Sequence, residues 1–186
     1  VDSLGQTRKK EWPGKIASLE ELREKLNTGL ESLTGEYPFP QWDVYGGDSS
    51  RKLMEGTGFF SKVKKDGRWH LADPMGNAFF SMGPDGVVAR ADCRVDGMEQ
   101  YLEWLPEEND SVYGNMFAPG RGNREERRRT CRLFSYEQAN LYRAFGESWY
   151  EKWKKLIVGR LKQYGMNTLG NWSDSRLYGT EKIPYV

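Results

Sequence analysis

The chain has 186 residues and a mass of 21.5 kDa, with 28 Lys and Arg residues against 27 Asp and Glu residues, a formal net charge of +1. This near-balance argues against a strongly electrostatic partner, so neither nucleic acid nor an anionic membrane surface is expected. Aromatic residues make up 13% of the chain, which excludes a mostly disordered protein, and no apolar run approaches the roughly 20 residues of a membrane span.

The first regular element is predicted directly after the polar residues 1–17. Ser18 and Glu21 form a capping box, in which the Ser hydroxyl accepts from a backbone N–H and the Glu side chain reaches back. Leucines then recur at helical spacing up to Leu33, and Gly35 is placed to end the helix. The aromatic and proline-rich stretch 37–42 cannot be helical, so we expect a strap packed on a neighbouring segment.

Three short strands are predicted between residues 58 and 90, over 58–64, 68–73 and 78–83. Asp66-Gly67 favours a tight hairpin between the first two, because Gly adopts the positive φ that such a turn needs. Polar and apolar residues alternate in the second strand, the pattern of a half-buried strand, and we expect His70 to be structural or surface-exposed there. The third strand is apolar on both faces and should be the most deeply buried.

The pattern weakens between residues 91 and 134, where we expect a short helix over 98–105 and a loop over 107–122. An arginine-rich stretch follows at 121–132 and includes Arg124, Arg127, Arg128 and Arg129. It favours a solvated segment with local ion pairs, or a face packed on another part of the protein. A nucleic-acid patch would carry more net charge and interleaved aromatic residues.

Cysteine and histidine usage points to no metal site. Cys93 and Cys131 are too few for a disulfide scaffold; they pair in an oxidising compartment or remain thiols in a reducing one. A single histidine cannot build a typical zinc site without these cysteines. The sequence also lacks a P-loop, a nucleophile elbow and a dinucleotide-binding fingerprint, so no cofactor is expected.

The C-terminal part predicts a crossover between parallel strands. Ser135 and Gln138 open a short helix that ends before Gly146, and a second helix follows over 147–164. Its apolar residues form one stripe, made of Trp149, Trp153, Leu156, Ile157, Leu161 and Tyr164. Gly165 lies where a helix C′ residue would, and 167–172 reads as a buried strand. Two parallel strands and one helix leave too much surface uncovered, so the chain should belong to a larger α/β domain.

Candidate binding residues lie at the carboxyl ends of these strands, where ligands gather in α/β sheets. Trp172 offers a flat apolar face for stacking on a sugar ring, and Asn171 and Asp174 offer hydrogen bonds to hydroxyl groups. The alternative is that Trp172 belongs to the core and Asp174 caps the next turn. Asp85 follows the strand at 78–83. Cleavage of a glycosidic bond needs two carboxyl groups about 5–10 Å apart. No such pair can be placed, and turn or capping roles are favoured for both carboxylates.

Two blocks of the sequence carry a resemblance to a known family. Residues 140–146, Trp149 and 160–174 closely resemble the β-agarases of glycoside hydrolase family 50. The stretch 58–83 is similar to the one that leads into the barrel of that family. Together the matches cover residues 58–90 and 135–186.

The resemblance implies an α/β fold: the start of a (β/α)8 TIM barrel, preceded by a small β-rich segment and incomplete within this chain. It implies an N-terminal helix and strap over 1–57 and the first part of the barrel over 58–186. The strand at 78–83 would be the first barrel strand, the helix at 147–164 the first barrel helix, and 166–172 the second strand. A closed barrel typically needs roughly 250 residues.

The resemblance also implies cleavage of β-1,4 linkages in agarose or a related galactan, with retention, by a secreted or periplasmic enzyme. The two catalytic glutamates of the family would fall beyond Val186, so no catalytic residue is assigned. The substrate-binding candidates are Asp85, Asn171, Trp172 and Asp174, and the expected partners are the polysaccharide and the remaining part of the barrel. The alternative is a non-catalytic module that binds a polysaccharide or a protein, with a stacking platform drawn from Trp12, Trp42, Trp69 and Trp104.

Overall fold

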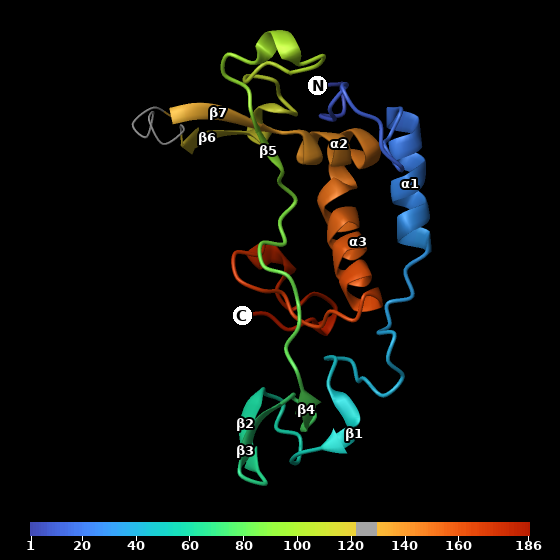
Figure 1. The fold of residues 1–186 in the computed structure, drawn as a ribbon, viewed down its shortest axis with the longest axis vertical. Coiled ribbons are helices and arrows are strands. Elements are labelled where there is room, and N and C mark those ends of the chain that lie inside the picture. The colour runs from blue at the N-terminus through green and yellow to red at the C-terminus, as the bar shows by residue number, and fades with distance from the viewer. Residues whose placement is uncertain (122–129) are drawn as a thin grey trace. The chain divides into compact units, whose positions relative to one another are not determined.

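The computed structural model describes residues 1–121 and 130–186 (Figure 1). They form two compact units, each built from two stretches of chain. Unit 1 comprises Val1–Gly29 and Ala89–Trp153, and unit 2 comprises Leu30–Val88 and Lys154–Val186. The boundary predicted between residues 57 and 58 coincides with no edge of these units and stays a prediction. None of the helices described is long and apolar enough to cross a membrane.

Unit 1 contains a three-stranded antiparallel sheet of order β5-β7-β6, formed by Asp92–Arg94 (β5), Phe117–Arg121 (β6) and Thr130–Ser135 (β7). Phe134 is fully buried in its core. The sequence pattern predicts none of these strands, and the loop expected over 107–122 is wrong for β6. Pro119 and Gly120 lower the strand propensity of this segment, and an edge strand tolerates them because one side of its backbone needs no partner.

The helices of unit 1 begin where the capping signals indicate. In α1 (Leu19–Glu31), the Ser18 hydroxyl accepts from the N–H of Glu21 at 3.1 Å, and the Glu21 carboxylate accepts from the N–H of Ala17 at 2.7 Å. In α2 (Tyr136–Phe145), the Ser135 hydroxyl caps the N–H of Gln138. The helix expected over 98–105 is wrong, since only a single 3₁₀ turn forms there, Glu99–Tyr101.

The arginine-rich stretch is described only in part. Arg124, Arg127, Arg128 and Arg129 lie outside the described residues. Arg132 lies inside them, and its guanidinium pairs with Glu99 and Glu108 at 2.7 Å each and also contacts Asp96. These partners lie 24 to 36 residues away in the chain, so the ion pairs of Arg132 are not local to the stretch, and the interpretation of the whole stretch stays a prediction. Cys93 and Cys131 are both free thiols.

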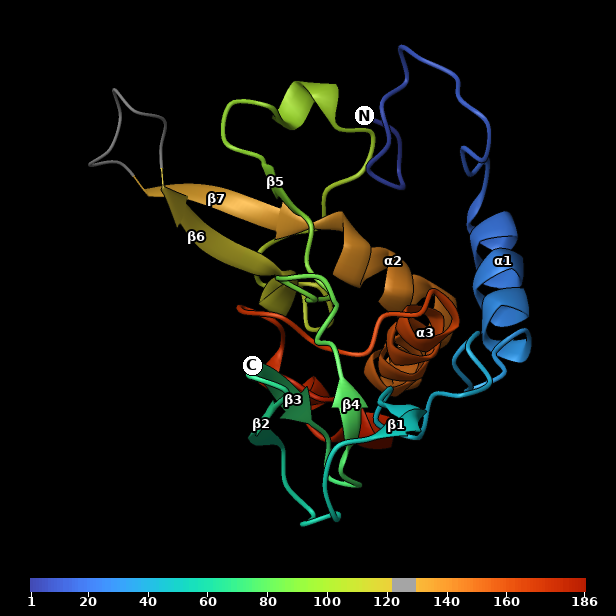
Figure 2. The same ribbon diagram turned by 60° about the horizontal axis from the view of Figure 1, so that its bottom comes forward.

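Unit 2 contains a four-stranded antiparallel sheet of order β1-β4-β3-β2 (Figure 2). Its strands are Asp48–Lys52 (β1), Ser61–Lys65 (β2), Arg68–Ala72 (β3) and Asn77–Phe79 (β4). The hairpin at Asp66-Gly67 is confirmed, with both residues at positive φ. The third strand is shorter than the predicted 78–83, because the chain leaves the antiparallel sheet after Phe79 and finds other partners.

The helix α3 (Trp149–Gln163) crosses the boundary between the units, and its second half belongs to unit 2. It ends at Gly165, whose φ of +73° is one that glycine adopts without strain. A Cβ atom on Gly165 would lie 2.7 Å from the ring of Phe39. The strap predicted over 37–42 is therefore packed on the end of this helix, as expected.

Candidate functional site

Two short segments of unit 2, one after β4 and one after α3, run side by side in parallel (Figure 1). The carbonyl of Met82 accepts two N–H groups of the second segment, at 2.8 and 3.1 Å. Further along, the N–H of Gly170 donates to Pro84 at 2.9 Å, and the N–H of Gly86 donates to the carbonyl of Asn171 at 2.7 Å. This is the slanted bonding of neighbouring parallel strands, and helix α3 lies between them in the chain.

A third segment joins on the other side. The N–H of Leu169 donates to the carbonyl of Pro184 at 2.8 Å, and its carbonyl accepts from the N–H of Val186 at 3.1 Å, which makes an isolated parallel bridge. The strand expected over 167–172 is therefore reduced to short pairings. Pro84 and Pro184 have no N–H to donate, so the ladder is interrupted on both sides.

The first two segments approach so closely that side chains are excluded at the contact. A Cβ atom on Gly83 would lie 2.6 Å from the carbonyl carbon of Thr168 and would overlap its oxygen. A Cβ atom on Gly170 would overlap the carboxylate of Asp85. The Asp85 side chain therefore lies against the backbone of the second segment at its carboxyl end, and it is exposed.

The side chains of the loop after the second segment differ in their exposure to solvent. Asn171 is exposed, and Trp172 is 81% exposed with a left-handed backbone at φ +60°. Within the described residues Trp172 therefore lies outside the core. A left-handed backbone is unfavourable for a side chain of this size, so neither the backbone conformation nor burial in this chain accounts for a tryptophan at position 172.

Asp174 caps the following turn, as the alternative interpretation states. Its side chain accepts from the N–H of Arg176 at 3.0 Å, and it pairs with the guanidinium of that residue at 2.6 Å. Ser173, which the sequence analysis did not single out, holds the loop to the first segment. Its buried hydroxyl donates to Gly170 at 2.8 Å and accepts from the N–H of Val87 at 3.2 Å. The four predicted residues thus lie on two adjoining segments: Asp85 on the first, the others on the second.

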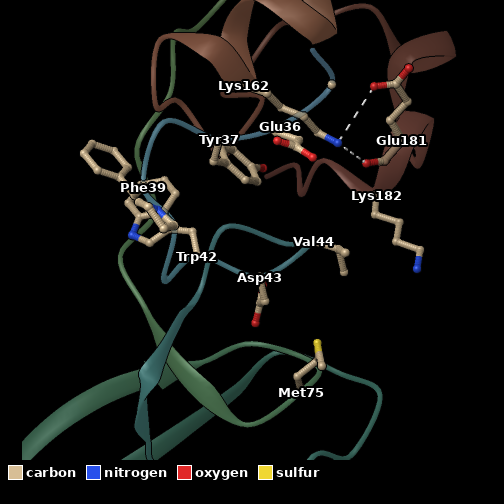
Figure 3. Close-up of a pocket in the computed structure, with 12 residues that line it drawn as sticks. Glu36, Tyr37, Phe39, Trp42, Asp43, Val44, Met75, Lys162, Glu181 and Lys182 are labelled. Carbon is tan, nitrogen blue, oxygen red and sulfur yellow. Dashed lines mark hydrogen bonds and ion pairs between the residues drawn. The ribbon is translucent and has the colours of Figure 1, made fainter.

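A pocket of about 600 Å³ lies in the same unit between the strap, the end of α3 and the turn at residues 181–182 (Figure 3). Tyr37, Phe39 and Trp42 form its aromatic part, with ring centroids 5.3 Å apart for Tyr37 and Trp42 and 4.6 Å for Phe39 and Trp42. The sequence does not reveal this pocket, because its residues come from four stretches that are far apart in the chain. The only local signal is the aromatic composition of the strap.

Two buried polar groups line this pocket. Lys162 is 6% exposed, and its amine donates to the carbonyl of Glu181 at 2.7 Å. Burial lowers the pKa of this amine, because a low-dielectric surrounding disfavours its charged form. The hydroxyl of Tyr37 is buried without a hydrogen-bond partner among the described residues. Burial and the neighbouring charge of Asp43 both raise its pKa.

Asp43 and Asp73 form a carboxyl pair beside the pocket. Asp73 is 1% exposed and accepts from the N–H groups of Met75 and Asn77 at 2.8 and 2.9 Å. Burial and the hydrogen bond to Asp43 raise the pKa of Asp73 to about 6. Burial opposes ionisation of Asp43 as well, but hydrogen bonds from Asp73, from the Asn77 amide at 2.6 Å and from two backbone N–H groups leave its pKa lowered. The two carboxyl groups therefore share one proton at mildly acidic pH.

Replacing Asp73 with asparagine is expected to stabilise the chain at alkaline pH. The raised pKa of Asp73 contributes stability that is complete below pH about 4 and is lost as the pH rises through about 6. An amide removes this titration and still donates to Asp43. We expect a gain of roughly 1–2 kcal/mol in the free energy of unfolding at pH 8 and about half of that gain at pH 5, which lies midway between the two pKa values, measured by urea denaturation.

The exposed turn residue Asp66 provides the control for this variant. Asp66→Asn should change stability equally at pH 5 and pH 8, because the residue lies outside the carboxyl pair. An Asp73→Asn variant whose effect is likewise independent of pH would contradict the shared proton.

The tryptophans of the proposed stacking platform have different surroundings. Trp104 packs edge-on against Tyr113, Phe134 and Tyr136 in the core of unit 1. Trp69 is 66% exposed on β3, with lysine amines 5.9 Å from its ring centre. In the described part of the chain, no group of three or more His, Cys, Asp or Glu residues is arranged to hold a metal ion.

Comparison with known proteins gives matches along the whole chain. No protein-family model matches. Beta-agarase B of Vibrio sp. (strain JT0107) is 32% identical over 212 residues, covering 100% of this chain and 22% of the relative. Beta-agarase A of the same strain is 30% identical over 200 residues, covering 100% of this chain and 19% of the relative. The chain thus spans about a fifth of the length of these curated relatives.

Comparison with solved structures gives matches to the same kind of protein. An exo-beta-agarase superimposes with a TM-score of 0.83 at 26% identity, covering 100% of this chain and 31% of that one. PfGH50B gives a TM-score of 0.83 at 25% identity and 30% coverage of that chain, and the agarase AgWH50C gives 0.82 at 26% and 29%. The resemblance to the β-agarases of glycoside hydrolase family 50 is therefore confirmed.

Proposed function

We propose that this chain, which is similar along all of its residues to family-50 β-agarases, forms the N-terminal part of an agarose-degrading glycoside hydrolase. The similarity of all 186 residues to part of both Vibrio β-agarases carries the proposal. The enzyme cleaves β-1,4 linkages of agarose or a related galactan with retention, and is secreted or periplasmic. In this proposal its catalytic glutamates lie outside the 186 residues, as the resemblance to the family implies.

The parallel segments of unit 2 support a role as the first strands of a (β/α)8 barrel. In this assignment residues 78–83 form the first strand, α3 is the first barrel helix, and 166–172 form the second strand. The exposed apolar side chains on these segments are consistent with burial against the rest of a barrel: Phe80 is 78% exposed, Met82 42% and Tyr185 54%. The proposed partner of these exposed side chains is therefore the part of the barrel that these 186 residues do not form.

The strand-end residues supply substrate contacts in this proposal. Ligands of barrel enzymes bind at the carboxyl ends of the strands, and Asp85, Asn171, Trp172 and Asp174 all follow a parallel segment. The open face of Trp172 stacks on a galactose ring, while Asn171 and Asp85 bind hydroxyl groups. Asp174 contributes mainly by holding the loop, since Arg176 already engages its carboxylate.

The test combines turnover and binding. We expect the purified chain to release no reducing ends from agarose, because it lacks both catalytic glutamates, yet to be retarded in electrophoresis through agarose. Trp172→Ala should reduce the retardation several-fold, because stacking on an aromatic ring is a main source of affinity for sugars. Turnover by the chain alone, or retardation unchanged in this variant, would contradict the proposal.

A second candidate is a non-catalytic polysaccharide-binding surface on β3. The exposed ring of Trp69, flanked by Lys62 and Lys64, is the observation that favours it. Trp69→Ala provides the matched comparison in the same gel. If Trp69→Ala abolishes retardation and Trp172→Ala does not, binding belongs to the β3 surface.

A further inference from the structure

We propose that the pocket between the strap and the end of α3 binds one neutral saccharide unit, as a second sugar site of this chain; the identity of the sugar rests on the proposed function. The pocket lies at the amino ends of the parallel segments. Lys182 immediately precedes the third segment, and Lys162 lies in the last turn of α3, before the second. The strand-end residues lie at the opposite, carboxyl ends of the same segments.

The pocket offers unused hydrogen-bond donors. An ammonium group has three N–H donors. For Lys162 the structure gives one hydrogen bond, to the Glu181 carbonyl, while the Glu181 carboxylate is 3.8 Å away (Figure 3). Among the described residues the Tyr37 hydroxyl has no hydrogen-bond partner, and the Lys162 amine is 5.7 Å from the Tyr37 ring centre. Buried donors without acceptors are costly, so a ligand that brings oxygen atoms to them is favoured.

The aromatic wall matches the apolar face of a sugar ring. Tyr37, Phe39 and Trp42 pack against one another at tilted or edge-on angles, which leaves ring surface at the pocket. Phe39 is 40% exposed. A volume of about 600 Å³ lies within the range of small-ligand pockets. A ring with an apolar face and polar edges satisfies the wall and the buried donors together.

Charge decides between a neutral sugar and an anion. The pocket is lined by three carboxylates, Glu36, Asp43 and Glu181, and by two lysines, Lys162 and Lys182. An anionic ligand would face an excess of negative charge at close range. Hydroxyl groups, by contrast, donate to carboxylates and accept from lysines, so a neutral polyhydroxylated ring uses both kinds of lining residue.

The test uses the complete chain and an oligosaccharide prepared from agarose as the probe, with binding followed by isothermal titration. Tyr37→Phe removes only the unpartnered hydroxyl, so it should leave thermal stability unchanged or higher. We expect it to weaken binding roughly three- to tenfold, the effect of one lost hydrogen bond. Tyr164→Phe, which alters an exposed tyrosine outside the pocket lining, should bind like the parent chain.

A third variant separates this site from the strand ends. If Tyr37→Phe binds as tightly as the parent, or if binding is lost only in Trp172→Ala, the pocket is not a sugar site. If binding weakens in Tyr37→Phe and not in Trp172→Ala, the pocket is supported, while the strand-end contacts of the proposed function fail. Tighter binding of an acidic oligosaccharide than of the neutral probe would overturn the charge argument.

Discussion

Replacing Gly83 with alanine is expected to destabilise the chain by more than about 3 kcal/mol. The new Cβ would overlap the carbonyl oxygen of Thr168 and lie 2.6 Å from its carbon. Both obstacles are backbone atoms, so no rotation of a side chain relieves the overlap. The two parallel segments must therefore separate, which breaks the hydrogen bonds between them. Urea denaturation followed by circular dichroism measures the shift in midpoint.

Gly58→Ala serves as the control for this variant. Gly58 has a φ of +80°, and no heavy atom lies within 4 Å of the position of a Cβ atom there. Alanine there costs only the strain of a left-handed backbone, about 1 kcal/mol. A Gly83→Ala variant that loses no more stability than Gly58→Ala would show that the segments are farther apart than described.

Removing the side chain of Asn167 is expected to cost about 3–5 kcal/mol. The residue is fully buried, and its amide donates to the carbonyls of Gly46 and Phe80, each at 3.0 Å. Its side-chain oxygen accepts from the N–H of Met82 at 2.9 Å and from the Thr168 hydroxyl at 3.1 Å. Asn167→Ala leaves three backbone groups buried without partners. Thermal unfolding of the variant measures the loss.

Two further variants sharpen this expectation. Asn171→Ala changes an exposed asparagine four residues later and should stay within roughly 0.5 kcal/mol of the parent chain. Asn167→Asp keeps the acceptor but loses both donors to Gly46 and Phe80, so it should be nearly as damaging as alanine at neutral pH. If Asn167→Asp unfolds like the parent, the two amide donor bonds contribute nothing.

The local signals of the sequence locate most helices and turns. Ser18 with Glu21, and Ser135 with Gln138, predict helix starts that the structure confirms, because capping depends only on residues a few positions apart. The hairpin at Asp66-Gly67 and the helix end at Gly165 are predictable for the same reason. The resemblance to β-agarases adds an expectation that no local signal contains, namely that these elements belong to a larger α/β fold.

The elements that sequence reasoning missed depend on distant partners. Strand β6 contains Pro119 and Gly120, so its composition argues against a strand. It forms because it pairs with strand β7. The strand at 167–172 was overestimated, since its length depends on Pro84 and Pro184 in the neighbouring segments.

In the candidate site, too, residues next to a predicted element can be found from the sequence, whereas groups assembled from distant residues cannot. Trp172 and Asn171 were identified because they follow a predicted strand, and the capping role of Asp174 was foreseen from its place in a loop. The pocket could not be predicted, because Tyr37 and Lys162 are far apart in the chain. The Asp43–Asp73 pair was hidden for the same reason.

The left-handed backbone at Trp172 has an evolutionary consequence. Glycine or asparagine would occupy this position with less strain, and tryptophan adds the further cost of an almost wholly hydrated indole. If Trp172 contacts a sugar as proposed, homologous chains that keep this contact should retain an aromatic residue at the position, and Gly or Asn should appear in those that have lost it.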